Sequence, residues 1–352
     1  VISKGKVNPS FWKDKKVLVT GHSGFKGFWM FLLLKKLGSN VYGVSIEKNS
    51  SEIYKTFSKY EKIENEEFID IRDGDRLADF LEDLKPDIVF HLAAQSLVHT
   101  AKDNPKETLE INILGSFNLL NIVTKSKKRT GVIVATTDKV YEHPEQINTE
   151  ENSLGSFEFY GASKVGLENI IDAFNNDIET RNKISRVRSG NVLGGGDGGD
   201  NRLLTDVISS IKSNKNIYLR NPDSIRPWQF VLDSVGGYLL VAQENFENNI
   251  PEKYNLNSEK ADNITVFELT KKLVKKFESP VEIIIDSNDK YSEAKELRLS
   301  SKKAVKKLNW KNFYKAEEFI ENIFLWENVK SERDVIEATN KQVVEYIEKA
   351  SR

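Results

Sequence analysis

The sequence predicts an α/β fold, in which a doubly wound parallel sheet is followed by a smaller α+β C-terminal lobe. Up to about residue 187, apolar strand-like runs alternate with amphipathic or polar segments, which is typical of a parallel sheet with helices on both faces. Beyond residue 190 the pattern changes to a Gly/Asp loop over 194–199, short strands and separate helical segments. We therefore expect a sheet domain over 9–187, which segments from about 226–256 can rejoin, a lobe over 188–330 and a helical tail over 331–352.

The individual elements follow from apolar runs and helix signals. Strands are expected over 17–20, 41–46, 68–71, 87–93 and 131–137, and helices over 25–37, 105–123, 160–174, 265–278 and 315–330. The start of the helix over 105–123 is well marked, because Asn104 is a capping residue, Pro105 takes the first helical position and Glu107 the third.

Composition excludes several classes of partner. The chain has 352 residues, of which 39% are hydrophobic, and its Lys+Arg total of 52 nearly balances its Asp+Glu total of 53. A formal net charge of -1 creates no global field for nucleic acid or a membrane surface. The longest apolar run, 28–34, is too short to span a bilayer, and no N-terminal segment resembles a signal peptide. We expect a soluble, cytoplasmic protein.

Metal chemistry is not expected either. The sequence has no Cys, which excludes disulfides and thiolate ligands. The histidines are scattered without ligand spacing, at His22, His91, His99 and His143. We interpret His91 as a core residue and predict no metal site.

A glycine-rich turn joins the first predicted strand to the first helix. Residues 21–27 read Gly-His-Ser-Gly-Phe-Lys-Gly, that is, G-x-x-G-x-x-G. Glycine permits positive φ in a tight turn, and the missing Cβ lets the backbone approach a pyrophosphate at the helix N-terminus. An ordinary glycine-containing turn is the alternative. We predict a dinucleotide site that includes Gly21, Ser23, Gly24, Phe25, Lys26 and Gly27.

A Tyr-x-x-x-Lys pair supplies a candidate base. At this spacing both side chains share one helix face, where an ammonium can lower the pKa of the phenol. Tyr160 and Lys164 fit the pattern, as do Tyr291 and Lys295. We favour the first pair, because it follows the strand over 131–137 at the carboxyl edge, where parallel α/β sheets bind ligands. The second pair is interpreted as a chance match.

The same strand ends in reactive side chains. Thr136 and Thr137 are followed by Asp138 and Lys139, which bring a carboxylate and an amine to the carboxyl edge of the sheet. A carboxylate beside an amine offers an acid and a base of separate pKa values. An exposed turn with a salt bridge is the alternative.

Other predicted contacts come from strand ends and from isolated polar residues. Asp70 and Ile71 lie at the end of a predicted strand, where an adenine could be held, although a solvated loop explains them almost equally well. Asn112 needs a partner because its amide is unfavourable in mid-helix. Small residues after the strand at 87–93 permit close approach of a dinucleotide, at Leu92, Ala93 and Ala94. Polar and cationic candidates for a second anionic group are Asn191, Arg202, Arg220 and Arg226.

These motifs together resemble the extended short-chain dehydrogenase/reductases of the Rossmann type that act on nucleotide sugars, and most closely the CDP-glucose 4,6-dehydratases. The similarity runs from about residue 9 to 346, and Asp138-Lys139 is its most discriminating part, because related TDP-glucose dehydratases have Asp-Glu there. The matching segments are 11–12, 21–27, 91–98, 136–142, 160–164, 190–197 and 225–229.

The resemblance implies a lyase with a tightly held NAD, which is reduced and reoxidised within one turnover. Tyr160, with a pKa lowered by Lys164, would take the proton from O4 of the sugar, and Thr137 would help hold O4. Lys139 would remove the C5 proton while Asp138 protonates the departing C6 hydroxyl. The product would be a 4-keto-6-deoxy sugar for deoxysugar and surface polysaccharide synthesis.

The resemblance also implies a binding set and an assembly. The cofactor set comprises the glycine turn, Asp70, Ile71, Leu92, Ala93, Ala94, Asn112, Tyr160 and Lys164; the substrate set comprises Gln95, Ser96, Asn191, Arg202, Arg220 and Arg226. Family members commonly pair through two helices each, here 105–123 and 160–174. A homodimer is therefore expected.

Departures from the family pattern leave alternatives open. Ser45 stands near the position where NAD-dependent relatives carry Asp, and Glu47 can substitute for it, so NADP stays an alternative cofactor. Gly198-Gly199 replaces a usual Trp and Phe159 a usual Pro, which leaves the exact sugar open and, to a lesser degree, the nucleotide base. A C4 epimerase, a dehydratase of another nucleotide sugar and a non-catalytic dinucleotide sensor are the competing hypotheses.

Overall fold

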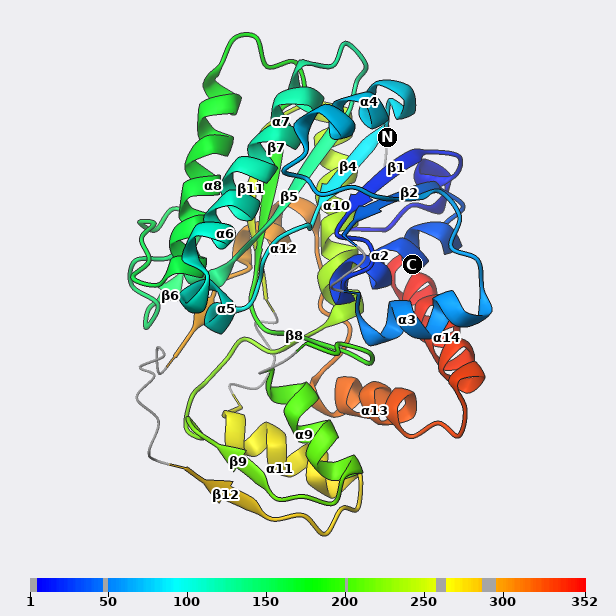
Figure 1. Ribbon diagram of the computed structural model, residues 1–352, viewed down its shortest axis with the longest axis vertical. Coiled ribbons are helices and arrows are strands. Elements are labelled where there is room, and N and C mark those ends of the chain that lie inside the picture. Colours follow the sequence, from blue (N-terminus) through cyan, green and yellow to red (C-terminus); the bar gives the residue numbers. More distant parts are fainter. Residues whose placement is uncertain (1–4, 47–49, 200–201, 258–263, 287–295) are drawn as a thin grey trace.

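A central parallel sheet organises the molecule (Figure 1). The computed structural model describes residues 5–46, 50–199, 202–257, 264–286 and 296–352. Seven of the described strands form this sheet in the order β11-β7-β5-β4-β1-β2-β3, and every neighbouring pair is parallel. Their bounds are β1 Lys16–Thr20, β2 Asn40–Ser45, β3 Glu66–Phe68, β4 Ile88–His91, β5 Gly131–Thr137, β7 Ile184–Ser189 and β11 Lys253–Leu256. The predicted doubly wound fold is confirmed.

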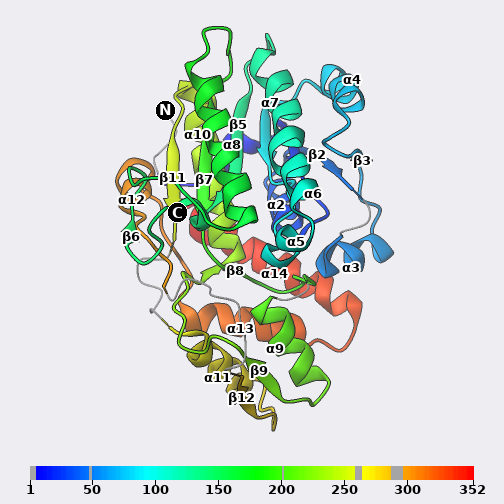
Figure 2. The ribbon, with the colours of Figure 1, turned by 60° about the vertical axis from the view of Figure 1, so that its left-hand side comes forward.

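Helices cover both faces of the sheet, as Figures 1 and 2 show together. One face is covered by α2 (Phe25–Lys36) and α10 (Val231–Asn248), with α14 (Glu332–Ala350) packed against α2. The other face carries α4 (Gly74–Leu84), α7 (Ser116–Lys125) and α8 (Phe159–Asn176). The apolar residues form a separate core cluster on each face, because strands of such a sheet are buried on both sides.

A smaller lobe lies beyond the carboxyl edge of the sheet. It contains a two-stranded parallel sheet of β9 (Ile217–Leu219) and β12 (Ile283–Ile285), flanked by α9 (Leu203–Lys212) and α11 (Val266–Lys276). The chain returns from this lobe through α10 and β11 to the main sheet. Further elements are α1 Pro9–Trp12, α3 Glu52–Tyr60, α5 Val98–Asp103, β6 Ile147–Asn148, β8 Val192–Leu193, β10 Gln229–Phe230, β13 Arg298–Leu299, α12 Lys302–Leu308 and α13 Ala316–Glu327.

Two predicted elements differ from the structure. The strand expected over 68–71 is β3, Glu66–Phe68, and it ends where that prediction begins. It is a partly exposed edge strand rich in charge, whereas Ile69 and Ile71 are buried in the loop after it. Side-chain burial and strand pairing therefore fall on different residues there.

The long helix predicted over 105–123 contains a change of helical type. It consists of α6 (Pro105–Leu109), the π-helical segment η2 (Glu110–Gly115) and α7. Pro105 takes the first helical position as predicted, but the Asn104 side chain makes no capping hydrogen bond. A π-helical turn admits one additional residue, and such turns are frequent at functional sites.

Candidate active site

The glycine turn after β1 is compact and lies against the end of β4. Gly21 has a φ of +74°, and a Cβ on it would approach the backbone nitrogen of Ala93 to 2.8 Å. A Cβ on Gly27 would lie 2.0 Å from the carbonyl oxygen of Gly21. Glycine is required at position 21 by conformation and by space, and at position 27 by space. The turn thus brings the N-terminus of α2 beside residues 92–94, as the dinucleotide hypothesis requires.

The end of β2 is tied to the same turn. The Ser23 backbone N–H donates to Ser45 Oγ over 3.1 Å, and both serines are buried. The Asp70 carboxylate makes an ion pair with Arg72 (Nη2 to Oδ2, 2.6 Å) and accepts that residue's backbone N–H. Glu47 and the Tyr291–Lys295 pair lie outside the described residues.

His91 is a core residue, as predicted. Its Nδ1 lies 2.7 Å from Thr20 Oγ1 and its Nε2 lies 2.8 Å from Ser116 Oγ. Burial, with a smaller contribution from Lys164, lowers the pKa of His91 to about 3, so the imidazole is neutral. It holds β1, β4 and α7 together beneath the site.

Asn112 lies in η2 and finds the partners that its mid-helix position demands. Its Oδ1 accepts the Gln95 backbone N–H over 2.9 Å, and its Nδ2 donates to the Gln95 carbonyl and to Ser163 Oγ, each at 2.9 Å. The Gln95 side chain is bonded within its own loop, to Leu97, and to Thr108. Asn112 therefore joins the loop after β4 to helix α8.

Tyr160 and Lys164 lie in the first turns of α8 and are buried. Burial raises the pKa of Tyr160 well above its usual value, and a hydrogen bond with Thr137 acts in the opposite direction. Burial and then the neighbouring charge of Lys26 lower the pKa of Lys164 to about 8. The Lys164 ammonium lies 3.4 Å from the Ala135 carbonyl oxygen. The Lys164 ammonium is therefore directed at the β5 backbone, and burial is the largest influence on the pKa of Tyr160.

Thr137, Asp138 and Lys139 lie where β5 ends and the short 3-10 turn Asp138–Val140 begins. Thr137 Oγ1 donates to Asp138 Oδ1 over 3.0 Å and accepts the Lys139 backbone N–H. The second carboxylate oxygen, Oδ2, is buried and has no hydrogen-bond partner among the described residues. Burial raises the pKa of Asp138, against the opposing charge of Lys139. Asp138 and Tyr160 are close enough for each other's charge to matter.

The predicted contacts for an anionic group, three arginines and Asn191, fall into two groups. Arg202 pairs with Asp197 (Nη1 to Oδ1, 2.6 Å) and donates to Ser96 Oγ over 3.2 Å, while Arg226 is buried near Asp138. Lys26 is a third cation in this region. Burial, and then the nearby charge of Arg202, lower its pKa to about 8. Arg220 and Asn191 are exposed instead. The structure therefore brings Ser96, Lys26, Arg202 and Arg226 toward the catalytic candidates.

Sequence reasoning missed two residues of this region. Glu158 is the N-cap of α8, and its carboxylate accepts the backbone N–H groups of Tyr160 (3.0 Å) and Gly161 (2.7 Å). An acidic residue just before a helix could have signalled this role. Gln229 is buried, and neither end of its amide has a partner among the described residues, a condition that no sequence pattern reveals.

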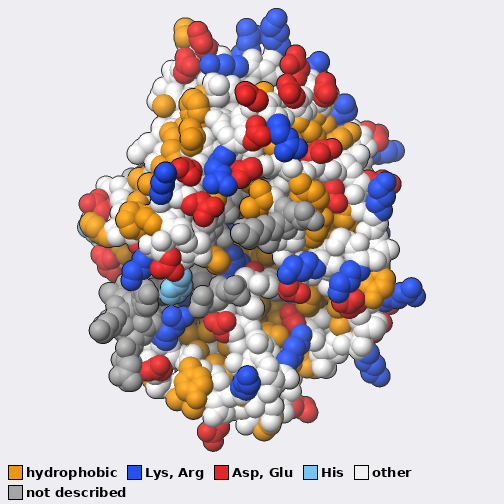
Figure 3. Space-filling view, in the orientation of Figure 1, with side chains coloured by type: hydrophobic (Ala, Val, Ile, Leu, Met, Phe, Trp, Pro, Cys, Tyr) orange, Lys and Arg blue, Asp and Glu red, His pale blue; other side chains and the backbone are white. Residues whose placement is uncertain are grey.

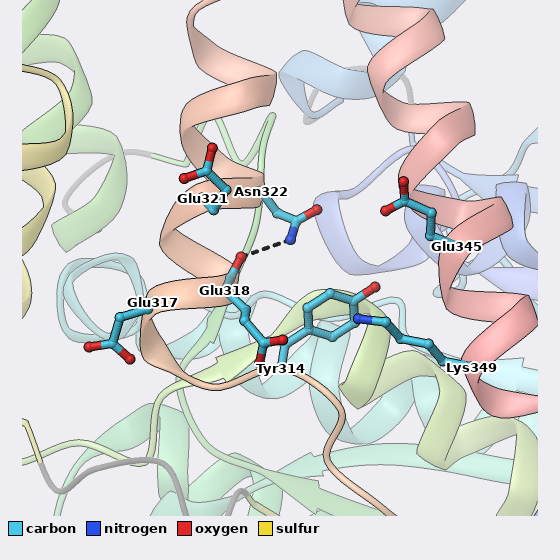
Figure 4. A pocket seen from close by; sticks show the side chains of 7 residues that line it. All are labelled: Tyr314, Glu317, Glu318, Glu321, Asn322, Glu345 and Lys349. Carbon is cyan, nitrogen blue, oxygen red and sulfur yellow. Dashed lines mark hydrogen bonds between the residues drawn. The ribbon is translucent and has the colours of Figure 1, made fainter.

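Two surface cavities are lined by residues outside the predicted site. A cavity of 280 Å³ lies between α13 and α14, as Figure 4 shows, and none of its lining residues belongs to the predicted site. Figure 3 shows acidic and basic side chains interspersed over one face of the molecule. Within the described ranges, no group of His, Cys, Asp and Glu could hold a metal ion, and no helix combines the length and apolarity needed to cross a bilayer.

Comparison with known proteins identifies the family. Residues 18–323 match the family model described as GDP-mannose 4,6 dehydratase. The chain belongs to this family. It is 31% identical to the CDP-glucose 4,6-dehydratase of Salmonella typhimurium, with 98% of this chain and 100% of that protein covered. It is 26% identical to a pea UDP-glucose 4-epimerase, over 89% of this chain and 95% of the relative.

Solved structures support the fold of this 4,6-dehydratase family member. A UDP-glucose-4-epimerase from Stenotrophomonas maltophila superposes with a TM-score of 0.79 at 19% identity, and the match covers 89% of this chain and 98% of the epimerase chain. An epimerase from Methanothermobacter thermautotrophicus gives 0.78 at 24% identity, with 96% of both chains covered. The resemblance inferred from the motifs is confirmed.

Proposed function

We propose that the protein is a CDP-glucose 4,6-dehydratase, which converts CDP-glucose to CDP-4-keto-6-deoxyglucose and water. The observation that carries this proposal is the buried Asp138, whose Oδ2 has no hydrogen-bond partner among the described residues. Its carboxyl group is close enough to Tyr160 and Lys139 for electrostatic coupling. Loss of a C6 hydroxyl needs such an acid, whereas C4 epimerisation does not. The full-length similarity to a CDP-glucose 4,6-dehydratase supports the nucleotide base.

The residues present fit NAD as the resident cofactor. The Gly21 and Gly27 positions leave no space for a Cβ, which gives a bare backbone at the positive end of α2 for a pyrophosphate. Ser23, Gly24, Phe25 and Lys26 would complete that phosphate site, with Asp70 and Ile71 toward the adenine, residues 92–94 along the dinucleotide, and Tyr160 and Lys164 at the nicotinamide ribose. When bound, NAD would accept hydrogen with its electron pair from C4 and return it to C6. Asn112 would act by holding the loop at Gln95.

Proton transfer at O4 falls to Tyr160. Its phenolate form would accept the O4 proton, while Thr137 would help hold O4. Because burial alone raises the pKa of Tyr160, the base role needs a positive neighbour in the occupied site. Lys164, with a pKa of about 8, keeps its ammonium at neutral pH and is one helical turn away.

Elimination of water falls to the neighbouring pair. A C4 carbonyl acidifies the C5 proton, which Lys139 would remove. The electron pair left on C5 forms the C5–C6 double bond as the C6–O bond breaks, and Asp138 protonates the departing hydroxyl. When hydrogen with its electron pair returns to C6, C5 would take back a proton from the Lys139 ammonium. Burial raises the pKa of Asp138, which favours the protonated form that this role requires.

The substrate phosphates would lie against the cationic group. Arg202 and Arg226 have the guanidinium fork that matches phosphate oxygens, and Ser96 and Gln95 lie on the adjoining loop. In the structure Arg202 is engaged by Asp197, so diphosphate binding would compete with that ion pair. Asn191 and Arg220 would contribute from the lobe.

We also propose a homodimer that acts in the cytoplasm. Leu109, Leu114 and Phe117 project exposed apolar surface from the helices over 105–125, and Phe159 does so from α8. Neighbouring exposed apolar side chains are typical of an interface. Nucleotide sugars and NAD are charged and do not cross a bilayer unaided, which favours the compartment where both are made.

Incubation with CDP-glucose, without added reductant, tests the function. We expect a product whose mass is lower by one water. A product of unchanged mass would support the epimerase instead. Dehydration of GDP-mannose in preference to CDP-glucose would reassign the substrate. No reaction with any nucleotide sugar would contradict the proposal that the protein is a nucleotide-sugar dehydratase.

A further inference from the structure

A buried ionic cluster lies behind the candidate catalytic residues. Glu168 belongs to α8, one turn after Lys164, and Arg188 belongs to β7; both side chains are buried. The guanidinium binds the carboxylate through two bonds, Nε to Oε1 at 2.8 Å and Nη2 to Oε2 at 2.6 Å. Arg186 is a second cation, 2.6 Å from Glu168, and it also pairs with Asp172.

One end of the cluster is the last part of β5. Thr136 Oγ1 donates to Glu168 Oε1 over 2.7 Å, and Thr136 immediately precedes Thr137. This bond fixes α8 against the strand end. It lies one helical turn from Lys164 and two from Tyr160.

The other end of the cluster is Tyr141, which follows the turn Asp138–Val140. Arg188 Nη1 donates to Tyr141 Oη over 2.8 Å, and the guanidinium also lies 5.0 Å from the centre of the Tyr141 ring. The Tyr141 hydroxyl in turn donates to Asn255 Oδ1 on β11 over 2.6 Å. Two linked groups, Glu168 and Arg188, therefore hold both flanks of the segment over 137–140.

The charges in this cluster are present at neutral pH. Burial acts to raise the pKa of Glu168, but Arg188 lowers it below the usual value. Buried ion pairs add little net stability over apolar packing, because desolvation offsets their attraction. Their directional bonds do restrict how β5, β7 and α8 can shift relative to one another.

We infer that Glu168, Arg188, Thr136 and Tyr141 form a positioning cluster, which sets the placement of Asp138–Lys139 relative to Tyr160–Lys164. The inference rests on the proposed dehydratase function. None of the four residues needs to touch the substrate. Their effect is on the geometry of the groups that do, where a misplacement of about 1 Å costs about 100-fold in rate.

Single-hydroxyl variants test the cluster with little risk of unfolding. Tyr141→Phe and Thr136→Val each remove one polar atom from it, whereas Thr136→Ser keeps the hydroxyl. Tyr254→Phe is the matched control. Tyr254, on β11, is a buried tyrosine like Tyr141, but its hydroxyl donates to Glu244 over 2.6 Å and not to the cluster. For Tyr141→Phe and Thr136→Val we expect kcat to fall at least about tenfold with KM changed less than about threefold. Thr136→Ser should restore most of kcat, and Tyr254→Phe should leave kcat unchanged.

Backbone hydrogen exchange over 138–141 in the full-length protein is the second readout. We expect faster exchange in Tyr141→Phe than in Tyr254→Phe or the parent. This measurement needs no turnover, so it tests the cluster even if the parent fails to dehydrate CDP-glucose, a result that would contradict only the proposed function. Unchanged exchange in Tyr141→Phe overturns the inference, as does a parent-like kcat in an active protein.

Discussion

Gly161 in α8 lies directly against the carbonyl oxygen of Lys139: a Cβ on Gly161 would approach that oxygen to 2.7 Å and Ser156 Oγ to 2.1 Å. The first turn of α8 thus rests on the turn that carries the candidate acid and base. Glu158 caps the same helix end through the backbone N–H groups of Tyr160 and Gly161. The turn that carries Asp138 and Lys139 therefore meets the helix end that carries Tyr160 at this backbone contact.

Gly161→Ala is expected to disturb that contact. Despite alanine's higher helix propensity, overpacking should lower the free energy of unfolding by about 1–3 kcal/mol and reduce kcat. Gly74→Ala is the control, because its Cβ would meet Asn118 no closer than 3.4 Å. Denaturant unfolding and initial rates measure both. Equal stability of the two variants would contradict the contact.

Lys139→Met is expected to stop the reaction before water is lost. Oxidation at C4 needs Tyr160 and not Lys139, so reduced cofactor should accumulate on addition of CDP-glucose. Exchange of the C5 proton, followed in deuterated water, should cease. The exposed Lys106→Met serves as the control. Exchange at the parent rate in Lys139→Met would exclude lysine as the base.

Tyr160→Phe is expected to lose about 100- to 10,000-fold in kcat, because it lacks the group that exchanges a proton with O4. Neither reduced cofactor nor C5 exchange should appear, which separates this variant from Lys139→Met. Tyr218→Phe, at an exposed position, should behave as the parent. Stopped-flow absorbance with CDP-glucose makes the comparison.

The buried Asp233 predicts a pH dependence of stability. Burial raises the pKa of this carboxyl to about 7, even though it accepts the backbone N–H groups of Phe313 and Tyr314. Between the unfolded value near 3.8 and about 7, the folded state binds more protons, so this group's contribution falls as pH rises. The free energy of unfolding of the parent minus that of Asp233→Asn should therefore decrease by a few kcal/mol from pH 4 to pH 7. A difference that is flat with pH would refute the shift.

The homodimer predicts a mass change on disruption. Leu114 is 53% exposed in the chain, on the surface that the proposed interface would cover. Leu114→Glu should halve the particle mass measured by light scattering at micromolar concentration, since it buries a charge at the interface. Ile285→Glu in the lobe, 57% exposed, should not. A monomeric mass for the parent protein would contradict the proposed homodimer.

The sequence predicts strong patterns and misses contacts made by topology. The strand over 131–137 matches β5 residue for residue, because a buried parallel strand is a continuous apolar run. The mid-helix position of Asn112 predicted a polar partner, but nothing in the sequence pattern predicted the π-helical turn in which Asn112 lies. The charged edge strand β3 has no apolar run from which to be recognised.

The same distinction applies to the candidate site. Tyr160, Lys164 and the residues after β5 could be predicted, because motif spacing and strand ends are local features. The pairing of Glu168 with Arg188 could not, since it joins helix α8 to a strand of the sheet that α8 covers, and only the packed structure shows that both charges are buried.

The placement of β11 has a consequence for synthesis on the ribosome. Residues 253–256 complete the sheet by pairing with β7, whose residues are buried along the whole strand, and α10 covers the neighbouring β5. A nascent chain that has emerged only to about residue 190 carries every candidate dinucleotide contact, yet it exposes β7 as an unpaired edge. Such an edge is a template for misassembly. The sheet therefore cannot be completed before residue 256 has emerged, and a C-terminal deletion before 256 should yield aggregate rather than a small nucleotide-binding fragment.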